Sequence, residues 1–107
     1  MTHVDVTERA ALERSLRGCD AVVHLAGIDL GVTGDTRMTA DLSERIMRTN
    51  ALGTWNVLTA CQRLAIGKLV LASSEAALGL EFLDRDGPPP YLPIDEAHPL
   101  RPSDTYG

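Results

Sequence analysis

The sequence predicts an α/β fold with a parallel sheet, and three segments support this prediction. Residues 20–25 and 68–72 are short apolar runs rich in Val and Leu, as in buried parallel strands. Residues 41–65, which lie between them, repeat apolar side chains at helical spacing. Together they form a parallel crossover unit, and ligands bind outside the carboxyl ends of its strands. The residues at these ends are Ala26, Gly27, Ser73 and Ser74.

The elements before this crossover unit are short. Residues 3–6 resemble the end of a strand, and Thr7 is the expected N-cap of a helix over residues 8–17. Gly18 suits the end of that helix. After the first strong strand, the glycine-containing segment 27–39 is expected to be a loop beside the ligand edge.

The long helix is expected to begin near Asp41, with Glu44 in an approximate capping box, and to end before Gly67. The opposite side of this helix carries Leu52 and Trp55, and solvent exposure is one interpretation of these two residues. Its core-facing side is expected to be formed by Leu42, Ile46, Asn50, Gly53, Val57, Cys61 and Leu64.

Residues 75–107 are expected to form an irregular, proline-rich loop. The prolines at 88–90, 93, 99 and 102 forbid a regular helix or a central strand there. A loop of roughly 30 residues in so small a domain is usually functional. We therefore expect this segment to belong to the site.

Bulk properties exclude several classes of function. The 107 residues suffice for one small domain, and the net charge of −5 leaves no basic stripe for nucleic-acid phosphates. No apolar run approaches the roughly 20 residues that cross a bilayer. The first residues do not resemble a signal peptide. We expect a cytoplasmic protein with no membrane or nucleic-acid partner.

Cysteine and histidine usage indicates no metal site. Cys19 precedes a strand and Cys61 lies in a helix, so both are expected to be reduced and structural. Asp95, Glu96 and His98 have no companion ligands at suitable spacing. They are expected to be ordinary surface residues.

Several segments resemble the motifs of one enzyme family, in the family's own order. They are residues 3–7 (HVDVT), 18–27 (GCDAVVHLAG), 50–58 (NALGTWNVL), 72–79 (ASSEAALG), 93–96 (PIDE) and 99–107 (PLRPSDTYG). The helix segment is similar to N-x-x-G-T-x-N-V/L-L, the next to S-S-x-x-x-V/I-Y-G, and the last to the approach to a catalytic Y-G-x-S-K. The chain thus resembles the extended short-chain dehydrogenase/reductase family, also called NAD-dependent epimerase/dehydratases. Leu78 stands where the family usually has Tyr, a departure that bears on substrate.

The resemblance covers essentially the whole chain and implies a partial Rossmann-like, doubly wound parallel sheet. In that fold, the chain would lack the first strand and the glycine-rich turn that holds the pyrophosphate, and also the C-terminal half. The lysine expected four residues beyond Tyr106 lies outside it. We therefore expect the fragment to be inactive by itself.

The resemblance implies that Ser74 and Tyr106 are the catalytic pair. In the family's mechanism a tyrosinate exchanges the proton of a substrate hydroxyl while the nicotinamide exchanges hydride, and the serine hydrogen-bonds the reacting oxygen. The ordinary pKa of tyrosine is about 10, and neighbouring positive charge lowers it toward neutrality. The structural alternative for Ser74 is a hydroxyl that closes the end of a strand, and for Tyr106 it is an aromatic side chain in a loop.

The implied cofactor is NAD or NADP, and the implied substrate is sugar-like. For Asp5, a contact with the adenine and a helix-start carboxylate beside Thr7 are equally open. Asn50 is expected to fix the active-site backbone, with a local bond inside the helix as the alternative, and His24 is expected to be structural. The residues placed at the cofactor are Asp5, Val6, Leu25, Ala26, Gly27, Asn50, Ala72, Ser73 and Tyr106.

Three functions stay open at this point. The first is part of an NAD(P)-dependent oxidoreductase, epimerase or dehydratase. The second is a non-catalytic Rossmann-type module that binds a nucleotide or a partner, and the third is a truncated product with no independent function. The resemblance also implies a homodimer through the helix that carries Leu52 and Trp55, as the alternative to solvent exposure.

Overall fold

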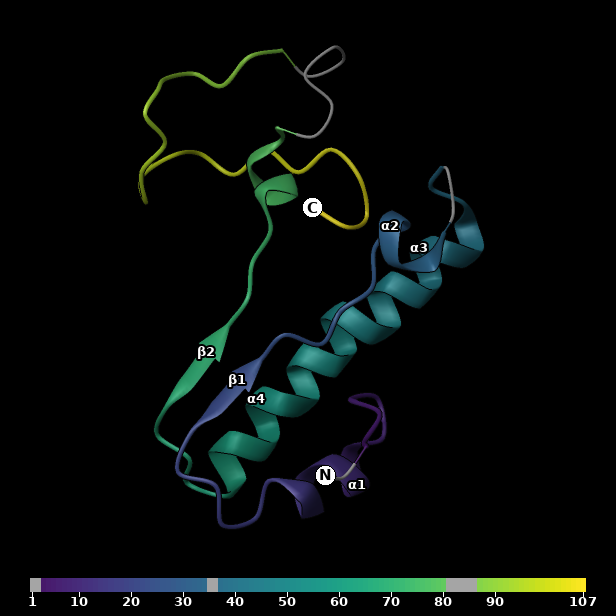
Figure 1. Ribbon diagram of the computed structural model, residues 1–107, viewed down its shortest axis with the longest axis vertical. Coiled ribbons are helices and arrows are strands. Elements are labelled where there is room, and N and C mark those ends of the chain that lie inside the picture. Colours follow the sequence, from purple (N-terminus) through teal and green to yellow (C-terminus); the bar gives the residue numbers. More distant parts are fainter. Residues whose placement is uncertain (1–2, 35–36, 81–86) are drawn as a thin grey trace. The chain divides into compact units, whose positions relative to one another are not determined.

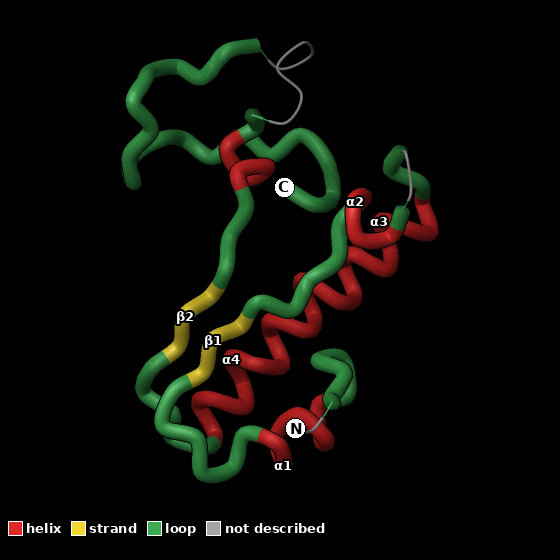
Figure 2. Tube along the Cα trace, viewed as in Figure 1, coloured by secondary structure: helices red, strands yellow, loops and turns green. Residues whose placement is uncertain are grey.

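The computed structural model describes residues 3–34, 37–80 and 87–107 of the chain. It divides the chain into two compact units. The N-terminal unit, residues 1–72, contains two strands and most of the helices (Figure 1). The C-terminal unit, residues 73–107, consists mainly of loops and turns (Figure 2).

A two-stranded parallel sheet forms the centre of the N-terminal unit. Strand β1 (Val22–His24) pairs with β2 (Leu69–Leu71), and Val23 lies opposite Val70 in the register. The predicted α/β fold with a parallel sheet is confirmed. The strands are shorter than the predicted ranges 20–25 and 68–72, although backbone hydrogen bonds continue just beyond both ends of the ladder.

The crossover between the strands is helical, as predicted, but it is not one regular helix. It consists of α3 (Ala40–Ile46), a π-helical segment η1 (Met47–Leu52) and α4 (Gly53–Arg63). Its N-cap is Thr39, whose Oγ1 accepts a hydrogen bond from the Leu42 N–H at 3.2 Å. The predicted start near Asp41 is therefore slightly late, because Thr39 supplies the capping oxygen.

The predicted core stripe of the crossover is confirmed. Asn50 and Leu64 are half-buried. The fully buried members are Leu42, Ile46, Gly53, Val57 and Cys61. Helix α1 (Arg9–Ser15) contributes Leu12 to a cluster with Val57 and Cys61, against which side chains of both strands pack.

Residues 3–6 do not form the predicted strand end; they form a loop held against α4. The buried Asn56 donates from Nδ2 to the Val6 carbonyl at 3.0 Å and to the Thr7 carbonyl at 3.3 Å. A Cβ on Gly53 would lie 2.5 Å from Val6 Cγ2, so a glycine is needed there. This segment therefore follows the helix surface and has no strand partner among the described residues.

The loop predicted over 27–39 contains one short helix, α2 (Leu30–Thr33). The Thr33 N–H and hydroxyl both donate to the Asp29 carbonyl, at 3.2 and 3.0 Å. A single turn of this length has no periodic pattern, so the spacing of apolar residues could not predict it.

The C-terminal unit is organised around a 3₁₀ turn, η2 (Glu75–Leu78), within the segment predicted to be irregular. The Arg101 N–H donates to the Ala77 carbonyl at 3.0 Å. Gly79 has a φ of +72°, and a Cβ there would collide with the Arg101 carbonyl oxygen. Glycine at 79 thus permits residues 101–107 to fold back onto the turn.

His98 is not the surface residue that the sequence predicted. Its exposed fraction is 5%, and its Nδ1–H donates to the Pro99 carbonyl at 3.0 Å. The Tyr91 ring packs against it with centroids 5.0 Å apart, and the Tyr91 hydroxyl donates to Asp95 at 2.7 Å. A loop without regular structure therefore has a small core of its own.

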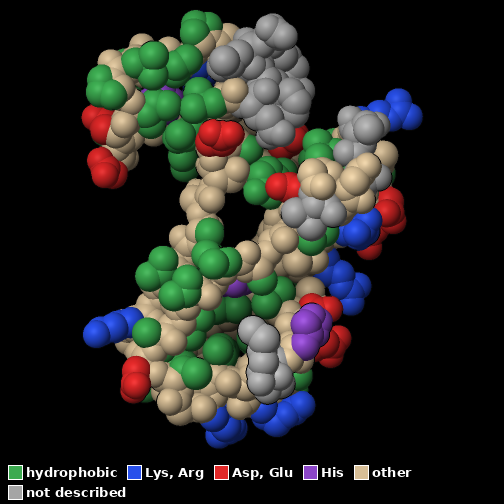
Figure 3. Space-filling model, viewed as in Figure 1, with side chains coloured by type: hydrophobic (Ala, Val, Ile, Leu, Met, Phe, Trp, Pro, Cys, Tyr) green, Lys and Arg blue, Asp and Glu red, His purple; other side chains and the backbone are tan. Residues whose placement is uncertain are grey.

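The side of the sheet opposite α4 is bare among the described residues. Val23 and Val70, paired across the two strands, are 64% and 61% exposed. Hydrophobic side chains gather over the strands in the space-filling view (Figure 3). A parallel sheet normally has both faces covered.

No described helix is long and apolar enough to cross a membrane.

Candidate active site

The loop that leaves β1 is fixed by Asn50. Asn50 Oδ1 accepts a hydrogen bond from the Ile28 N–H at 2.9 Å, and Asn50 Nδ2 donates to the Ile28 carbonyl at 2.9 Å. Both bonds join residues 22 positions apart. Asn50 therefore does not use its amide for a local bond inside the helix, which was the alternative. Asn50 therefore holds the backbone immediately after Gly27.

The residues just before this contact have small or exposed side chains. Leu25, Ala26 and Gly27 are all exposed, and they follow the last residue of β1. A Cβ on Gly27 would lie 3.5 Å from Asn50 Oδ1, so its backbone runs close to the amide. A sheet edge with small exposed residues on a fixed backbone fits a dinucleotide that lies against it.

Asn50 lies within the π-helical segment η1. Such segments are rare and often occur at functional sites, because the widened turn redirects a side chain. The spacing of apolar residues gave no indication of it, since the stripe continues through residues 42–64. The position of Asn50 was predicted, but the local geometry that presents it was not.

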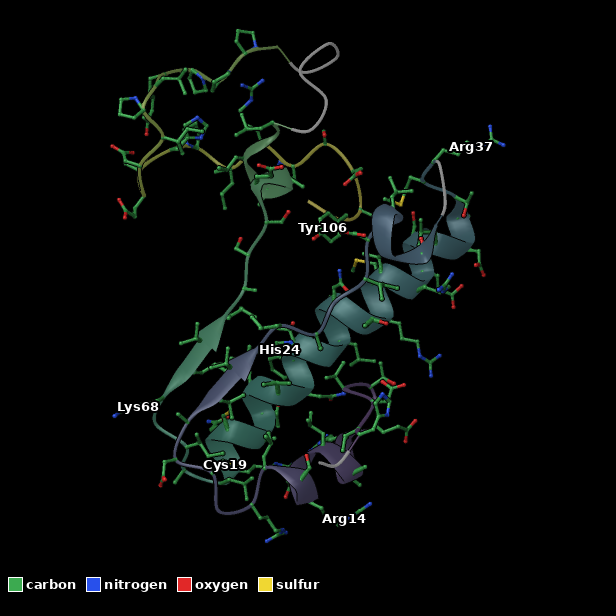
Figure 4. All side chains as sticks on the ribbon, viewed as in Figure 1. Arg14, Cys19, His24, Arg37, Lys68 and Tyr106 are labelled. Atoms are coloured by element: carbon green, nitrogen blue, oxygen red, sulfur yellow. The ribbon has the colours of Figure 1, made fainter. Side chains whose placement is uncertain are left out.

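His24 lies on the covered side of the sheet, between β1 and the crossover helix (Figure 4). It is 5% exposed, and its Nε2 shares a hydrogen bond of 3.0 Å with Thr54 Oγ1. Burial lowers the pKa of His24, so the ring is neutral near pH 7. This arrangement agrees with a structural role and gives Thr54 a function that the sequence reading missed.

Asp5 makes a turn with Thr7. Asp5 Oδ1 accepts hydrogen bonds from the Thr7 N–H and hydroxyl, both at 2.8 Å. These bonds, the backbone one foremost, hold the pKa of Asp5 below its ordinary value. Thr7 is therefore not the N-cap that was predicted; Glu8 occupies that position without a side-chain cap. The carboxylate is exposed, and its contact with Thr7 is the one that the helix-start alternative predicted.

Val6, which is also expected at the cofactor, makes contacts within the N-terminal unit. Its side chain packs on the buried cluster, and Asn56 binds its carbonyl. Ala72 is exposed, and its N–H donates to the His24 carbonyl at 3.1 Å. Ser73 is exposed at the start of the C-terminal unit.

Ser74 caps the turn η2. Its Oγ accepts a hydrogen bond from the Ala76 N–H at 3.2 Å, and the residue is half-buried. The bond uses an oxygen lone pair, so the hydroxyl proton stays available for an oxygen of a ligand. Ser74 can therefore donate to a reacting oxygen while its position is fixed by the turn.

Tyr106, which is labelled in Figure 4, belongs to the C-terminal unit, as Ser74 does. Asp104 Oδ1 accepts hydrogen bonds from the Tyr106 N–H at 2.9 Å and from the Gly107 N–H at 3.0 Å. A Cβ on Gly107 would lie 2.7 Å from the Ala76 carbonyl oxygen, so this backbone runs against η2. The two expected catalytic residues thus flank one packed turn.

The other expected site residues, Asp5, Val6, Leu25, Ala26, Gly27, Asn50 and Ala72, lie in the N-terminal unit. The sequence analysis gave no role to Asn56, Thr54 and Asp104, although all three lie in segments that resemble family motifs. A side-chain hydroxyl, carboxylate or amide at the end of an apolar pattern can indicate such a residue. Its hydrogen-bond partner cannot be predicted from the pattern, because the partner is distant in sequence or lies in a turn. Among the described residues, no three His, Cys, Asp or Glu side chains are grouped to hold a metal ion.

The profile of the NAD dependent epimerase/dehydratase family matches residues 1–107. The chain belongs to this family of Rossmann-fold proteins. Its fold agrees with that of a solved short-chain dehydrogenase/reductase superfamily protein from Agrobacterium tumefaciens, which carries bound NAD. The TM-score is 0.75 at 25% identity, over 95% of this chain and 27% of that one.

Two curated relatives show how the family varies. A putative UDP-glucose 4-epimerase from Methanocaldococcus jannaschii is 43% identical over 58 residues, 54% of this chain and 17% of the relative. The NAD-dependent glucose-6-phosphate dehydrogenase of Haloferax volcanii is 34% identical over 109 residues, 96% of this chain and 38% of the relative. The chain therefore spans well under half the length of these relatives.

Proposed function

We propose that residues 1–107 form part of an NAD(P)-dependent oxidoreductase, epimerase or dehydratase acting on a sugar-like substrate. The family membership and the sugar substrates in the names of two relatives support this. The observation that carries the proposal is the packing of residues 101–107 onto η2, because it joins Ser74 and Tyr106 in one unit.

In this proposal Tyr106 moves a proton and Ser74 polarises the oxygen. The Tyr106 hydroxyl gives a proton to, or takes one from, the reacting oxygen of the substrate. The Ser74 hydroxyl donates a hydrogen bond to the same oxygen, and the Ala76 N–H holds Ser74 Oγ in place. A general acid–base group of this kind contributes typically about 10² to 10⁴ in rate.

The N-terminal unit supplies the cofactor contacts. The cofactor lies against the exposed residues Leu25, Ala26 and Gly27, and Asn50 fixes the loop that follows them. Asp5 accepts a hydrogen bond from the adenine amino group. The nicotinamide dinucleotide supplies hydride transfer when bound. Both NAD and NADP are compatible with these contacts.

We also propose that the enzyme is a homodimer through the crossover helix. Trp55 is 63% exposed and Leu52 is 45% exposed, on the side away from the core. Aromatic residues are enriched at protein interfaces. Trp55→Ala should then convert the dimer to monomer in analytical ultracentrifugation, whereas the exposed Gln62→Ala on the same helix should not.

The experiment that tests the proposed function is a chimera. Residues 1–107 replace the matching segment of the H. volcanii NAD-dependent glucose-6-phosphate dehydrogenase, and NADH formation is measured. Turnover that depends on the inserted segment supports the proposal. A folded chimera that binds NAD without any turnover would favour the non-catalytic module instead.

A further inference from the structure

We infer that Asp104 is a positioning residue for Tyr106, an inference that rests on the proposed role of Tyr106. A single carboxylate oxygen, Asp104 Oδ1, accepts hydrogen bonds from the N–H groups of Tyr106 and Gly107, at 2.9 and 3.0 Å. Asp104 lies in the family-like segment 99–107, in which the resemblance gave a role to Tyr106 and none to Asp104. Its contacts are with the backbone that carries the proton-transferring side chain.

The two hydrogen bonds fix the direction in which Tyr106 leaves the backbone. Since one oxygen serves both N–H groups, the peptide planes on either side of Tyr106 must both face Asp104. The Cα–Cβ bond of Tyr106 is set by these two planes.

The turn at Asp104 lies between two anchored points. On one side, the Arg101 N–H donates to the Ala77 carbonyl at 3.0 Å. On the other side, the Gly107 backbone runs against the Ala76 carbonyl, with no room for a Cβ. Asp104 therefore closes a short segment whose ends are already held on η2.

The same turn η2 holds Ser74, so Asp104 connects the two proposed catalytic residues. Ser74 Oγ accepts from the Ala76 N–H, while the Ala76 carbonyl faces Gly107. Loss of the Asp104 contact would let Tyr106 move relative to Ser74. A misplacement of about 1 Å at a reacting group can lower the rate about 100-fold.

The acceptor, and not the negative charge, is the essential property in this account. Asp104→Ala removes it, whereas Asp104→Asn and Asp104→Ser keep a side-chain oxygen that accepts backbone N–H bonds. In the chimera, Asp104→Ala should lower kcat at least tenfold with little change in the KM for NAD. Asp104→Asn should keep kcat within about threefold of the parent.

Asp95 provides a matched control within the same unit. Asp95 Oδ1 accepts from the Ala97 N–H at 3.0 Å and from the Tyr91 hydroxyl at 2.7 Å, so it makes a similar turn elsewhere. Asp95→Ala should leave kcat near the parent value. If Asp95→Ala and Asp104→Ala lower kcat equally, general loosening explains both and the positioning role is wrong.

A second measurement keeps the inference testable if the chimera is inactive. In the ¹⁵N-labelled chimera, the amides of Tyr106 and Gly107 should exchange with solvent several-fold faster after Asp104→Ala, but not after Asp104→Asn or Asp95→Ala. Unchanged exchange would overturn the inference. A kcat that survives Asp104→Ala while Tyr106→Phe abolishes it would also overturn the inference and leave the proposed function standing. Survival of kcat in Tyr106→Phe would overturn the proposed function itself.

Discussion

Asn50 binds both backbone polar groups of Ile28, accepting from its N–H and donating to its carbonyl, each at 2.9 Å. The side-chain amide thereby makes the two hydrogen bonds that a neighbouring strand would make to this residue, at the point where the chain leaves the sheet. Ile28 directly follows Leu25, Ala26 and Gly27, so its contact with Asn50 also holds the backbone of these three residues. The proposed cofactor edge is thus held from the crossover helix.

Replacement of Asn50 should loosen that edge. Asn50→Ala leaves the Ile28 N–H and carbonyl without their partner, which costs about 1–3 kcal/mol for each polar group left unsatisfied. We expect a lower urea midpoint for the chimera and a raised KM for NAD. The exposed Gln62→Ala should change neither quantity.

Asn50→Asp separates the two hydrogen bonds of Asn50. The carboxylate still accepts from the Ile28 N–H but faces the Ile28 carbonyl without a proton to donate. It should therefore fail to restore the KM for NAD above pH 6. A KM equal to that of the parent in both Asn50 variants would show that this contact does not support the cofactor edge.

His24 should make the stability of the N-terminal unit depend on pH. Burial lowers its pKa below the ordinary 6.5, so the unfolded chain binds the proton more readily than the folded one. Stability is therefore complete above about pH 6.5 and decreases as the pH falls through the folded pKa. Urea midpoints between pH 5 and 8 should show this decrease.

The decrease should disappear in His24→Gln and persist in His3→Gln, because His3 is exposed. Thr54→Val should lower the midpoint at all pH values, since it removes the hydroxyl that binds Nε2. An unchanged pH profile in His24→Gln would show that some other group causes the acid sensitivity.

The 107-residue chain by itself should associate. The bare side of the sheet exposes Val23 and Val70, and an unpaired strand edge recruits other chains. Light scattering should show oligomers or aggregates, and Val23→Lys with Val70→Lys should reduce them. A monodisperse monomer with a sharp cooperative melt would contradict this prediction.

The same chain should bind NAD only weakly. Tight binding of the pyrophosphate uses backbone N–H groups of a glycine-rich turn at a helix N-terminus, and this sequence has no such fingerprint. The contacts at Asp5 and at residues 25–27 remain. Calorimetry should give a dissociation constant well above the micromolar range, and micromolar binding would mean that the cofactor contacts are misassigned.

The sequence predicted those parts of the molecule that depend on repeated apolar spacing. The strands around Val23 and Val70 and the core stripe from Leu42 to Leu64 have clear patterns, because burial of one face requires them. The 3–6 segment looked like a strand for the same reason, but its apolar residues pack on α4 without a strand partner among the described residues.

The remaining features depend on single contacts between distant residues, for which periodicity gives no signal. The hydrogen bonds from Asn56 to Val6, between His24 and Thr54, and from Ile28 to Asn50 join residues at least 22 positions apart. His98 was expected at the surface because no companion metal ligands lie at suitable spacing, yet its ring is buried, packs against Tyr91 and donates to the Pro99 carbonyl.

Ser74→Ala should slow turnover of the chimera less than loss of the tyrosine hydroxyl does. The serine orients and polarises the reacting oxygen but does not take its proton. We expect a lower kcat with an unchanged KM for NAD, because in the proposed mechanism Ser74 contacts the substrate and not the cofactor. A Ser74→Ala variant with the full kcat of the parent would remove Ser74 from the mechanism.

The measurement that tests the account most directly is the kcat of Tyr106→Phe in the chimera, compared with Tyr91→Phe. The two tyrosines lie in the same unit, but the Tyr91 hydroxyl is bonded to Asp95, outside the proposed site. We predict that Tyr106→Phe lowers kcat by about 10² to 10⁴ with unchanged cofactor affinity, while Tyr91→Phe keeps most of it. A Tyr106→Phe variant that retained most of the parent's kcat would contradict the proposed mechanism.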